Sequence, residues 1–299
     1  LRCLVGSEMC IRDSNYSPES LAPFFYLNKR DRKNIYIFST EKEALEFYNN
    51  FSNFVPEASH FPAWDTLSYD SFTPSLEIQG KRLQTLHNLL VMESFDIAMS
   101  MKSFTQKIFI NDLDVIDMQI GQEVDFENLI ENLAFLRYVN KDRVESRGTF
   151  SIRGGQIDIY PLNSEYPIRI IFNGDEVVEL KLFDYITQRS IKNIKKVLIT
   201  PSSELFQTNQ EDIYKSLEIE SKKDLDEYEL FQFSQNLENF KSLLDFVPDD
   251  ISINIIDFNS CKEVFSELQK IEDDSFNNLQ KFFSLNVSKM KSRYVDTLK

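Results

Sequence analysis

Residues 147–190 constrain the fold most strongly, because alternating runs of side chains meet there at tight turns. Apolar and polar residues alternate over 150–153 and 156–159, on either side of Gly154-Gly155. Glycine suits a two-residue hairpin turn, since a type I′ turn needs a positive φ at both central positions. This stretch therefore predicts a β-hairpin.

A second hairpin is predicted directly after the first. Residues 168–172 and 178–182 alternate on either side of Asn173-Gly174, the other dipeptide favoured in hairpins. The two hairpins predict an antiparallel sheet of about four strands with one buried and one solvated face. Arg153 and Arg169 are out of phase with the apolar residues, so we expect both on the solvated face, where neither is needed for the core. An ordinary solvated surface is the alternative interpretation of this pattern.

The same stretch carries short motifs in a fixed order. A glycine, an aromatic residue and an Arg-Gly pair precede an aliphatic-Asp-aliphatic-aromatic-Pro run. A Pro-x-Arg strand, a Gly-Asp-Glu turn, Phe-Asp and Thr-Gln-Arg-Ser follow. The residues are Gly148, Phe150, Arg153-Gly154, Ile157–Pro161, Pro167–Arg169, Gly174–Glu176, Phe183-Asp184 and Thr187–Ser190. In this order they resemble the UvrB-like module at the N-terminus of bacterial transcription-repair coupling factors (Mfd).

A second segment supports the resemblance. Residues 61–86, FPAWDTLSYDSFTPSLEIQGKRLQTL, are similar to a run in the same family, although Ser68 stands where the family usually has proline. The resemblance covers about residues 20–200 well and the remainder weakly. It implies a truncated N-terminal part of such a factor, without the motor domains.

The resemblance also implies a partner and the residues that contact it. In this family the module docks UvrA, which links removal of stalled RNA polymerase to nucleotide excision repair. The expected docking residues are Arg153 and Arg169, with Phe172 and Asn173 beside them and Arg147 and Arg189 as weaker candidates. Arginine–carboxylate pairs would supply the contact. Asn173 stands where the family often has an aromatic residue.

Further partners and cofactors are implied only for the parent protein. RNA polymerase and double-stranded DNA would be bound by its missing domains, and ATP and Mg would serve its missing translocase motor. For the present chain we expect no cofactor and no enzymatic activity of its own. The alternative is a DNA-binding motor fragment of a UvrB-like repair protein with residual nucleotide affinity.

The charge distribution agrees with a protein partner. The net charge of −15 argues against a general nucleic-acid binder. Residues 137–200 differ from the rest of the chain, since they contain 11 Lys/Arg and 8 Asp/Glu. A relatively basic module in an acidic chain favours an acidic partner surface.

Cysteine and histidine content excludes several classes of site. The three cysteines and two histidines have no metal-ligand spacing, and a disulfide framework is not expected, which favours a reducing cytoplasm. No stretch approaches the 20 or so apolar residues of a membrane span, so we expect no membrane association. Residues 1–14 lack the apolar core of a signal peptide and have no regular period, so we interpret them as a non-native leader.

Strand and helix patterns alternate outside the hairpins. Residues 34–39 and 95–100 are expected strands, and Thr40 with Glu43 predicts a capped helix between them. This order predicts a helicase-like α/β domain with a parallel sheet, into which a small α+β module is inserted. The expected parts are the leader 1–14, the first α/β part 15–103, the module 104–200 and an acidic, helix-rich part 201–299. In the last part we expect a strand at 252–258 and two helices at 261–270 and 275–289.

Phosphate-binding chemistry is missing from the expected place. A P-loop needs glycines and a Lys-Ser/Thr pair after the first strand, whereas residues 40–43 are Thr-Glu-Lys-Glu. We therefore predict no ATP binding at a P-loop. Trp64, with Phe61 and Tyr69, could stack a base or pack on the core, and packing is the favoured interpretation.

Overall fold

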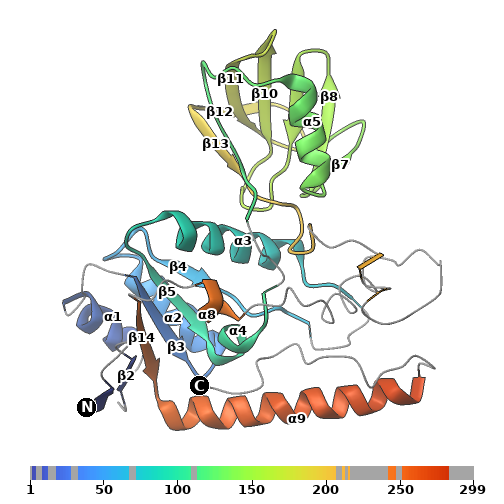
Figure 1. Cartoon of the computed structure of the whole chain (residues 1–299). Helices are drawn as coiled ribbons and strands as arrows, with labels where there is room; N and C mark the ends of the chain where they lie inside the picture. The colour runs from blue at the N-terminus through green and yellow to red at the C-terminus, as the bar shows by residue number, and fades with distance from the viewer. Residues whose placement is uncertain are drawn as a thin grey trace. The chain divides into compact units, whose positions relative to one another are not determined.

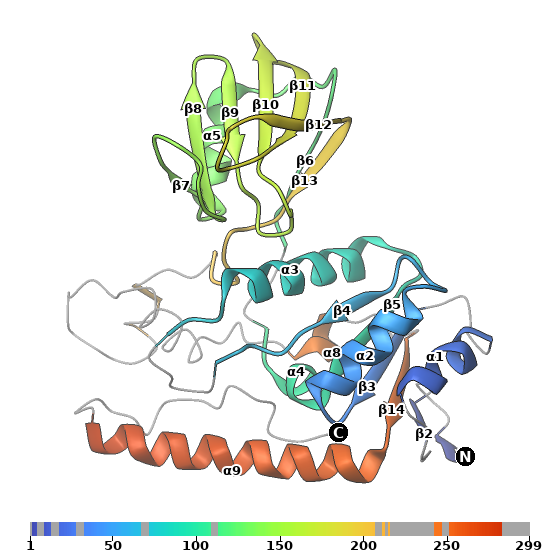
Figure 2. The ribbon, with the colours of Figure 1, turned by 180° about the vertical axis from the view of Figure 1, so that it is seen from behind.

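The computed structural model of the chain describes residues 2–4, 9–12, 18–27, 33–66, 72–108, 113–206, 211–212, 215, 242–246 and 251–282. The chain divides into two compact units (Figures 1 and 2). We call residues 1–74, 85–111 and 209–299 the α/β unit, and residues 75–84 and 112–208 the sheet unit. Each is described by itself.

The α/β unit is built on a mainly parallel sheet. Its strand order is β1-β2-β14-β3-β5-β4, and every described neighbouring pair except β1–β2 is parallel. The strands are β1 (Arg2–Leu4), β2 (Met9–Arg12), β3 (Asn34–Phe38), β4 (Ser59–Phe61), β5 (Asp96–Ser100) and β14 (Ser252–Ile256). The helices are α1 (Pro18–Leu27), α2 (Glu41–Phe51), α3 (Leu76–Val91), α4 (Met101–Thr105), α8 (Leu243–Phe246) and α9 (Phe258–Phe282), and α3 is divided between the two units. The mixed α/β class and the parallel sheet are confirmed.

The centre of this sheet is buried on both faces. Every residue of β3 and β5 is buried, as expected for parallel strands covered by helices. On one face, aromatic side chains of α1, β3 and α2 form the core. Tyr36 lies 4.8 Å from Phe25 and 5.1 Å from Phe47, measured between ring centroids, and Phe47 stacks on Phe51 at 5.0 Å. The alternate residues of β3, Ile35 and Ile37, are buried on the opposite face.

Two expectations for this unit differ from the structure. Residues 1–14 were interpreted as a non-native leader, whereas residues 9–12 of this segment form β2, which pairs with β14 in parallel register. An unpaired edge strand offers free N–H and C=O groups, which explains how a short segment can add to it. The helices expected at 261–270 and 275–289 form one helix, α9, because neither glycine nor proline interrupts 271–274. Residues 283–289 lie outside the described part of the chain.

The sheet unit contains a six-stranded sheet instead of the four strands expected. Its order is β12-β11-β10-β9-β8-β7, and all neighbouring pairs are antiparallel except β7–β8. The strands are β7 (Val139–Asn140), β8 (Thr149–Arg153), β9 (Gln156–Ile159), β10 (Ile168–Asn173), β11 (Glu176–Phe183) and β12 (Ser190–Ile194). A separate antiparallel pair joins β6 (Ile116–Gln119) to β13 (Lys196–Ile199). Lys195 separates β12 from β13, so this run of the chain is divided between two sheets.

Helix α5 (Phe126–Phe135) covers the apolar face of this sheet. It begins at Asp125, whose Oδ1 accepts the backbone N–H of Asn128 at 2.8 Å and so caps the helix. Phe126 contacts Phe172 of β10 edge to face, with 5.1 Å between ring centroids. The cross-strand neighbours Ile157 and Ile170 are fully buried on this face.

The turns and bulges of the hairpins set which residues face inward. Gly154 and Gly174 have φ values of 60° and 62°, and each is the first central residue of its turn. Their turn partners do not have positive φ, so the turns match type II′ rather than the expected type I′. A bulge after Ile171 shifts the pairing of β11, so Val177 is buried where Val178 was expected.

The first half of α3 belongs to the sheet unit because of its buried contacts. Arg82 Nε donates to Glu204 Oε1 at 2.8 Å, and neither side chain is exposed. A Cβ on Gly80 would lie 2.5 Å from the carbonyl oxygen of Leu162, so glycine is required there. No local pattern in the sequence predicts these contacts of Gly80 and Arg82 with distant residues.

Candidate partner-binding face

The face of the antiparallel sheet opposite α5 carries its polar side chains. Cross-strand pairing aligns Ser151, Asp158, Arg169 and Lys181 in one row and Arg153, Gln156, Ile171 and Glu179 in the next. We call this surface the polar face. Arg153 and Arg169 both lie on it, so the face predicted from alternation is the one observed.

Arg169 is held inside the polar face. Its Nε and Nη2 donate to Oδ1 and Oδ2 of Asp158, both at 2.8 Å, and its guanidinium lies 4.7 Å from the centroid of the Phe183 ring. The Arg169 side chain is 18% exposed and that of Asp158 is 3% exposed. The hydrogen bond with Asp158 raises the pKa of Arg169 despite partial desolvation. The expectation that Arg169 is unnecessary for the core is therefore wrong, because its charge neutralises a buried carboxylate.

Arg153 is placed differently. It is exposed, at the turn end of β8, and its Nη2 donates to the backbone oxygen of Asp142 at 2.8 Å. Among the described residues no carboxylate lies within ion-pair distance of it. Its guanidinium keeps donors that can meet a partner's carboxylate.

The weaker candidates also differ from one another. Arg147 is half-buried, donates from Nη2 to the backbone oxygen of Ser164 at 3.1 Å, and lies 5.5 Å from the Tyr160 ring centroid. These contacts give Arg147 a structural role. Arg189 is exposed, and its backbone oxygen accepts the N–H of Asp184.

Phe172 does not lie beside the two arginines as expected, whereas Asn173 alternates onto their face of the sheet. Phe172 is buried under α5 on the opposite face, because successive residues of a strand point to opposite sides. Asn173 is exposed at the end of β10, next to the turn. The structure therefore brings Arg153 and Arg169 onto one face and separates Phe172 from them.

Beside this face lies a loop that, apart from Arg189, was not predicted from the sequence as a contact surface. Residues Asp184–Arg189 expose Tyr185 and Ile186, while Arg143 donates from Nη2 to the backbone oxygen of Ile186 at 2.7 Å. Asp184 followed by Thr187 is the pattern of a side-chain-capped turn, which could have predicted the loop. Nothing in the pattern predicts that Arg143, 43 positions earlier, binds it.

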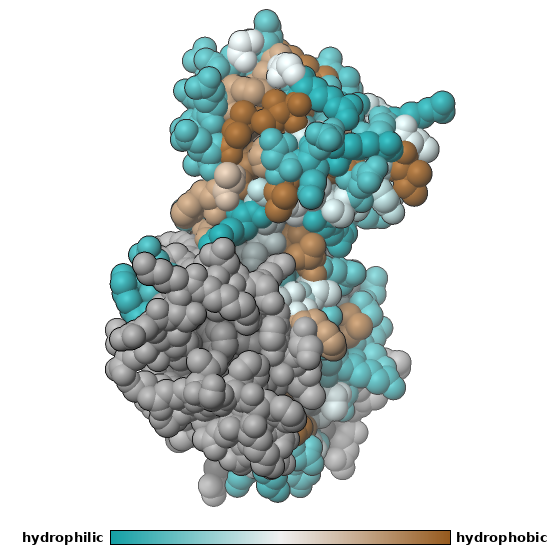
Figure 3. Space-filling view, turned by 90° about the vertical axis from the view of Figure 1, so that its right-hand side faces the viewer, coloured by the Kyte–Doolittle hydropathy of each residue, from teal (hydrophilic) through white to brown (hydrophobic). Residues whose placement is uncertain are grey.

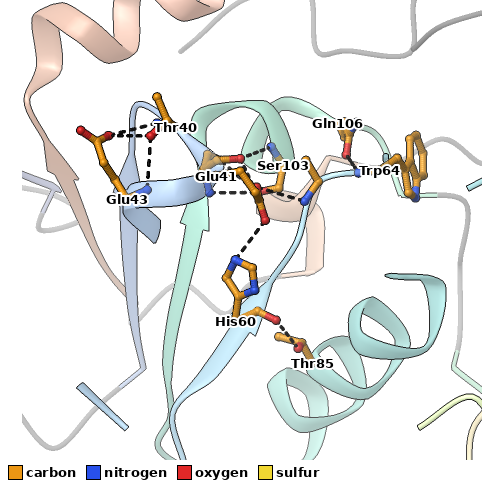
Figure 4. Close-up of polar contacts among 10 residues, drawn as sticks. Thr40, Glu41, Glu43, His60, Trp64, Thr85, Ser103 and Gln106 are labelled. Atoms are coloured by element: carbon orange, nitrogen blue, oxygen red, sulfur yellow. Dashed lines mark hydrogen bonds and ion pairs between the residues drawn. The ribbon is translucent and has the colours of Figure 1, made fainter. Parts of the chain in front are cut away.

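The carboxyl ends of the parallel strands form a second group of polar side chains, which we call the strand-end cluster (Figure 4). Glu41 lies at the start of α2. Its Oε1 is 3.0 Å from His60 Nε2, and its Oε2 accepts the backbone N–H of Ala63 at 3.3 Å. Burial would raise the pKa of Glu41, but hydrogen bonds with His60 and Ser100 outweigh it, so the pKa is lowered. The carboxylate thus stays ionised among donors of its own chain.

The strand-end cluster does not fit a nucleotide phosphate. The turn between β3 and α2 is Ser39-Thr40, without glycine, and Thr40 and Glu43 complete a capping box. A phosphate placed at this helix start would meet the carboxylates of Glu41 and Glu43.

Trp64 also lies in the interior of the α/β unit. It is fully buried, and its backbone N–H donates to Gln106 Oε1 at 2.9 Å (Figure 4). The packing interpretation is confirmed for Trp64 and for Phe61, which is also buried. Tyr69 lies outside the described residues.

Metal and membrane features were searched over the described part of the chain. There, no group of three or more His, Cys, Asp or Glu side chains could hold a metal ion. Nor does any described helix have the length and hydropathy of a membrane span.

Comparison with known proteins shows what the sheet unit is similar to. A family model described as UvrB interaction domain matches residues 116–205, which include the whole polar face. Similarity to curated proteins extends beyond this domain within the chain.

Transcription-repair-coupling factors are similar to this chain over different lengths. The factor of Escherichia coli K12 is 29% identical over 168 residues, which cover 54% of this chain and 14% of that protein. The Mycobacterium bovis factor is 30% identical over 142 residues, covering 44% and 12%. The Bacillus subtilis factor is 24% identical over 311 residues, covering 92% and 26%. The chain therefore spans about a quarter or less of each of these relatives, and the resemblance found in its motifs is confirmed.

Proposed function

We propose, from the premise that this chain is a UvrB-like module of the transcription-repair-coupling factor family, that it is a protein-recognition part that docks UvrA. Docking would link removal of stalled RNA polymerase to nucleotide excision repair. The translocase activity, ATP and Mg binding, and contacts with RNA polymerase and double-stranded DNA belong in this proposal to other parts of the parent protein. We also propose that the chain itself needs no cofactor and acts in the cytoplasm.

The observation that carries the proposal is the environment of Arg153. Within a matched UvrB interaction domain, this guanidinium is exposed and has no carboxylate partner among the described residues. An arginine of this kind can form a two-pronged hydrogen bond with a carboxylate of an acidic partner. Arg169 supports the face from inside, because its charge is already matched by Asp158.

A titration of UvrA with the chain tests this function. Arg153→Glu should weaken binding by about 30-fold or more, since truncation of a buried interfacial arginine costs about 2 kcal/mol and charge reversal adds repulsion. Lys195→Glu is the matched control, because it changes the net charge equally at an exposed site between β12 and β13. If Arg153→Glu binds UvrA as the parent does, docking does not use the polar face as proposed.

A further inference from the structure

The loop Asp184–Arg189 presents apolar side chains to solvent from a defined backbone. Ile186 is 67% exposed and Tyr185 is 39% exposed, although Phe183, directly before the loop, is fully buried. Apolar patches of the sheet unit also reach the surface between hydrophilic side chains in Figure 3. Contiguous apolar patches rimmed by polar residues mark protein interaction sites, and Tyr185 and Ile186 are neighbours in such a setting.

The loop is fixed from within by Asp184. Its Oδ1 accepts the backbone N–H groups of Ile186 at 3.1 Å and Thr187 at 2.6 Å, and the Thr187 hydroxyl at 2.9 Å. The hydrogen bonds from Thr187 lower the pKa of Asp184, so the carboxylate remains ionised in its turn. Gln188, with φ at 62°, donates from Nε2 to the backbone oxygen of Tyr185 at 2.7 Å.

Arg143 fixes the loop from outside. Its Nη2 contacts the backbone oxygens of Tyr185 and Ile186, at 3.4 and 2.7 Å. A loop that is already ordered loses less conformational entropy when a partner binds. The exposed position of Ile186 is therefore maintained before any partner arrives.

The loop is continuous with Arg153. Arg153 donates to the backbone of Asp142, and the adjacent Arg143 donates to the backbone of Ile186. Segments 141–147 and 184–192 together contain five Lys/Arg and three Asp/Glu. Of these carboxylates, that of Asp184 is engaged by its own turn and that of Glu145 lies 3.4 Å from Arg143 Nε. The two segments that meet at Ile186 therefore combine exposed apolar side chains with an excess of positive charge.

We propose that Ile186 and Tyr185 form an apolar anchor of the docking surface, and that they take an apolar side chain set among acidic residues on the partner. This inference rests on the proposed function, so the partner is UvrA. Arg143 acts as a positioning residue, because it holds the loop backbone while its own side chain is not the apolar contact. Arg153 supplies the neighbouring charge contact.

The experiment is a calorimetric titration of UvrA with the full chain and two Ile186 variants. Ile186→Asp should weaken binding about tenfold or more, and Ile186→Ala less, because a central apolar contact is lost and the carboxylate also repels an acidic surface. Ile120→Asp is the matched control. Ile120 is 44% exposed and directly follows β6, which belongs to a different sheet. All three variants should melt near the parent's temperature by circular dichroism.

A second pair of variants separates positioning from charge. Arg143→Lys keeps the positive charge but loses the planar donor group, so both Arg143→Lys and Arg143→Ala should weaken UvrA binding severalfold. A purely electrostatic role would instead leave Arg143→Lys at the parent's affinity.

The outcomes distinguish the two proposals. If the parent chain does not bind UvrA, the proposed function is overturned and this inference with it. If the parent binds and Arg153→Glu does not, but Ile186→Asp binds normally, only the apolar anchor is overturned. Weakening by Ile186→Asp with an unaffected Ile120→Asp supports it.

Discussion

The strand-end cluster of the α/β unit and the polar face of the sheet unit use charged side chains in opposite ways. At the strand ends, Glu41 is surrounded by donors from His60 and the backbone of Ala63. On the polar face, Arg169 is paired internally, but Arg153 keeps its charge in solvent. The first arrangement disfavours an anionic ligand, because a carboxylate already occupies the site, and the second leaves a cation exposed to solvent.

The difference shows that the location of a charge does not by itself indicate a ligand site. Carboxyl ends of parallel strands are the usual place for ligands in α/β sheets, yet here that position is filled by the chain's own carboxylate. A solvated face of an antiparallel sheet usually carries no site, yet here it carries Arg153, which has no carboxylate partner in the described part of the chain. The two sites differ in whether the charged side chain already has partners within its own chain.

The largest effect should come from removing the internal pair of the polar face. Arg169→Ala should lower the free energy of unfolding by about 2–3 kcal/mol, because it leaves the buried Asp158 carboxylate without its cation. Urea unfolding measures the change. The double variant Arg169→Ala with Asp158→Ala should recover part of the loss, and an Arg169→Ala chain as stable as the parent would contradict the internal role.

A smaller, pH-dependent effect is expected in the strand-end cluster. Glu41→Gln should cost about 1 kcal/mol at most at pH 7, since 41% of the Glu41 side chain is exposed and its interactions are screened. The pKa of Glu41 is lowered in the folded state, so its contribution is complete above the unfolded value of 4.5 and is lost as the pH falls through the folded value. Urea unfolding of parent and variant at pH 7 and near pH 3 should therefore show a difference that shrinks in acid.

Glu46→Gln is the control for this experiment, because Glu46 lies on the same helix and pairs with the exposed Lys42. Its effect should stay below about 0.5 kcal/mol at both pH values. A Glu41→Gln difference that is unchanged in acid would show that the carboxylate charge is not what stabilises the cluster.

A still smaller effect on stability is expected for Arg153, the other arginine of the polar face. Arg153→Ala should change the free energy of unfolding by less than about 0.5 kcal/mol, since its side chain is exposed and makes one backbone contact. The same urea series as for Arg169→Ala gives the value. A loss as large as that of Arg169→Ala would place Arg153 in the core of the fold and remove the basis of the proposed docking.

Nucleotide should have no effect. Mg-ATP is expected to leave the melting temperature of the chain unchanged, because carboxylates occupy the helix start where a phosphate would bind. A ligand at 100 times its dissociation constant would add about 2.7 kcal/mol of stability. A reproducible, concentration-dependent rise in melting temperature would contradict the closed arrangement of the strand ends.

Local patterns in the sequence predicted the regular elements well where one physical rule dominates. Alternation around Gly154 and Gly174 predicted both hairpins, and the Thr40 cap predicted the start of α2. The same rule failed at Val178, because a bulge shifts the alternation by one residue. Bulges depend on how neighbouring strands fit together and have no reliable local pattern.

The sequence by itself determined the α/β class, the hairpins, the face that carries Arg153 and Arg169, and the family resemblance. Each of these depends on residues close together in the chain, whose spacing fixes their direction or motif. Only the tertiary structure decided that Asp158 neutralises Arg169, that Arg143 holds the loop of Ile186, and that Glu41 meets His60. Those contacts join different strands, loops and helix ends, and whether a charge is paired or free depends on which segments folding brings together.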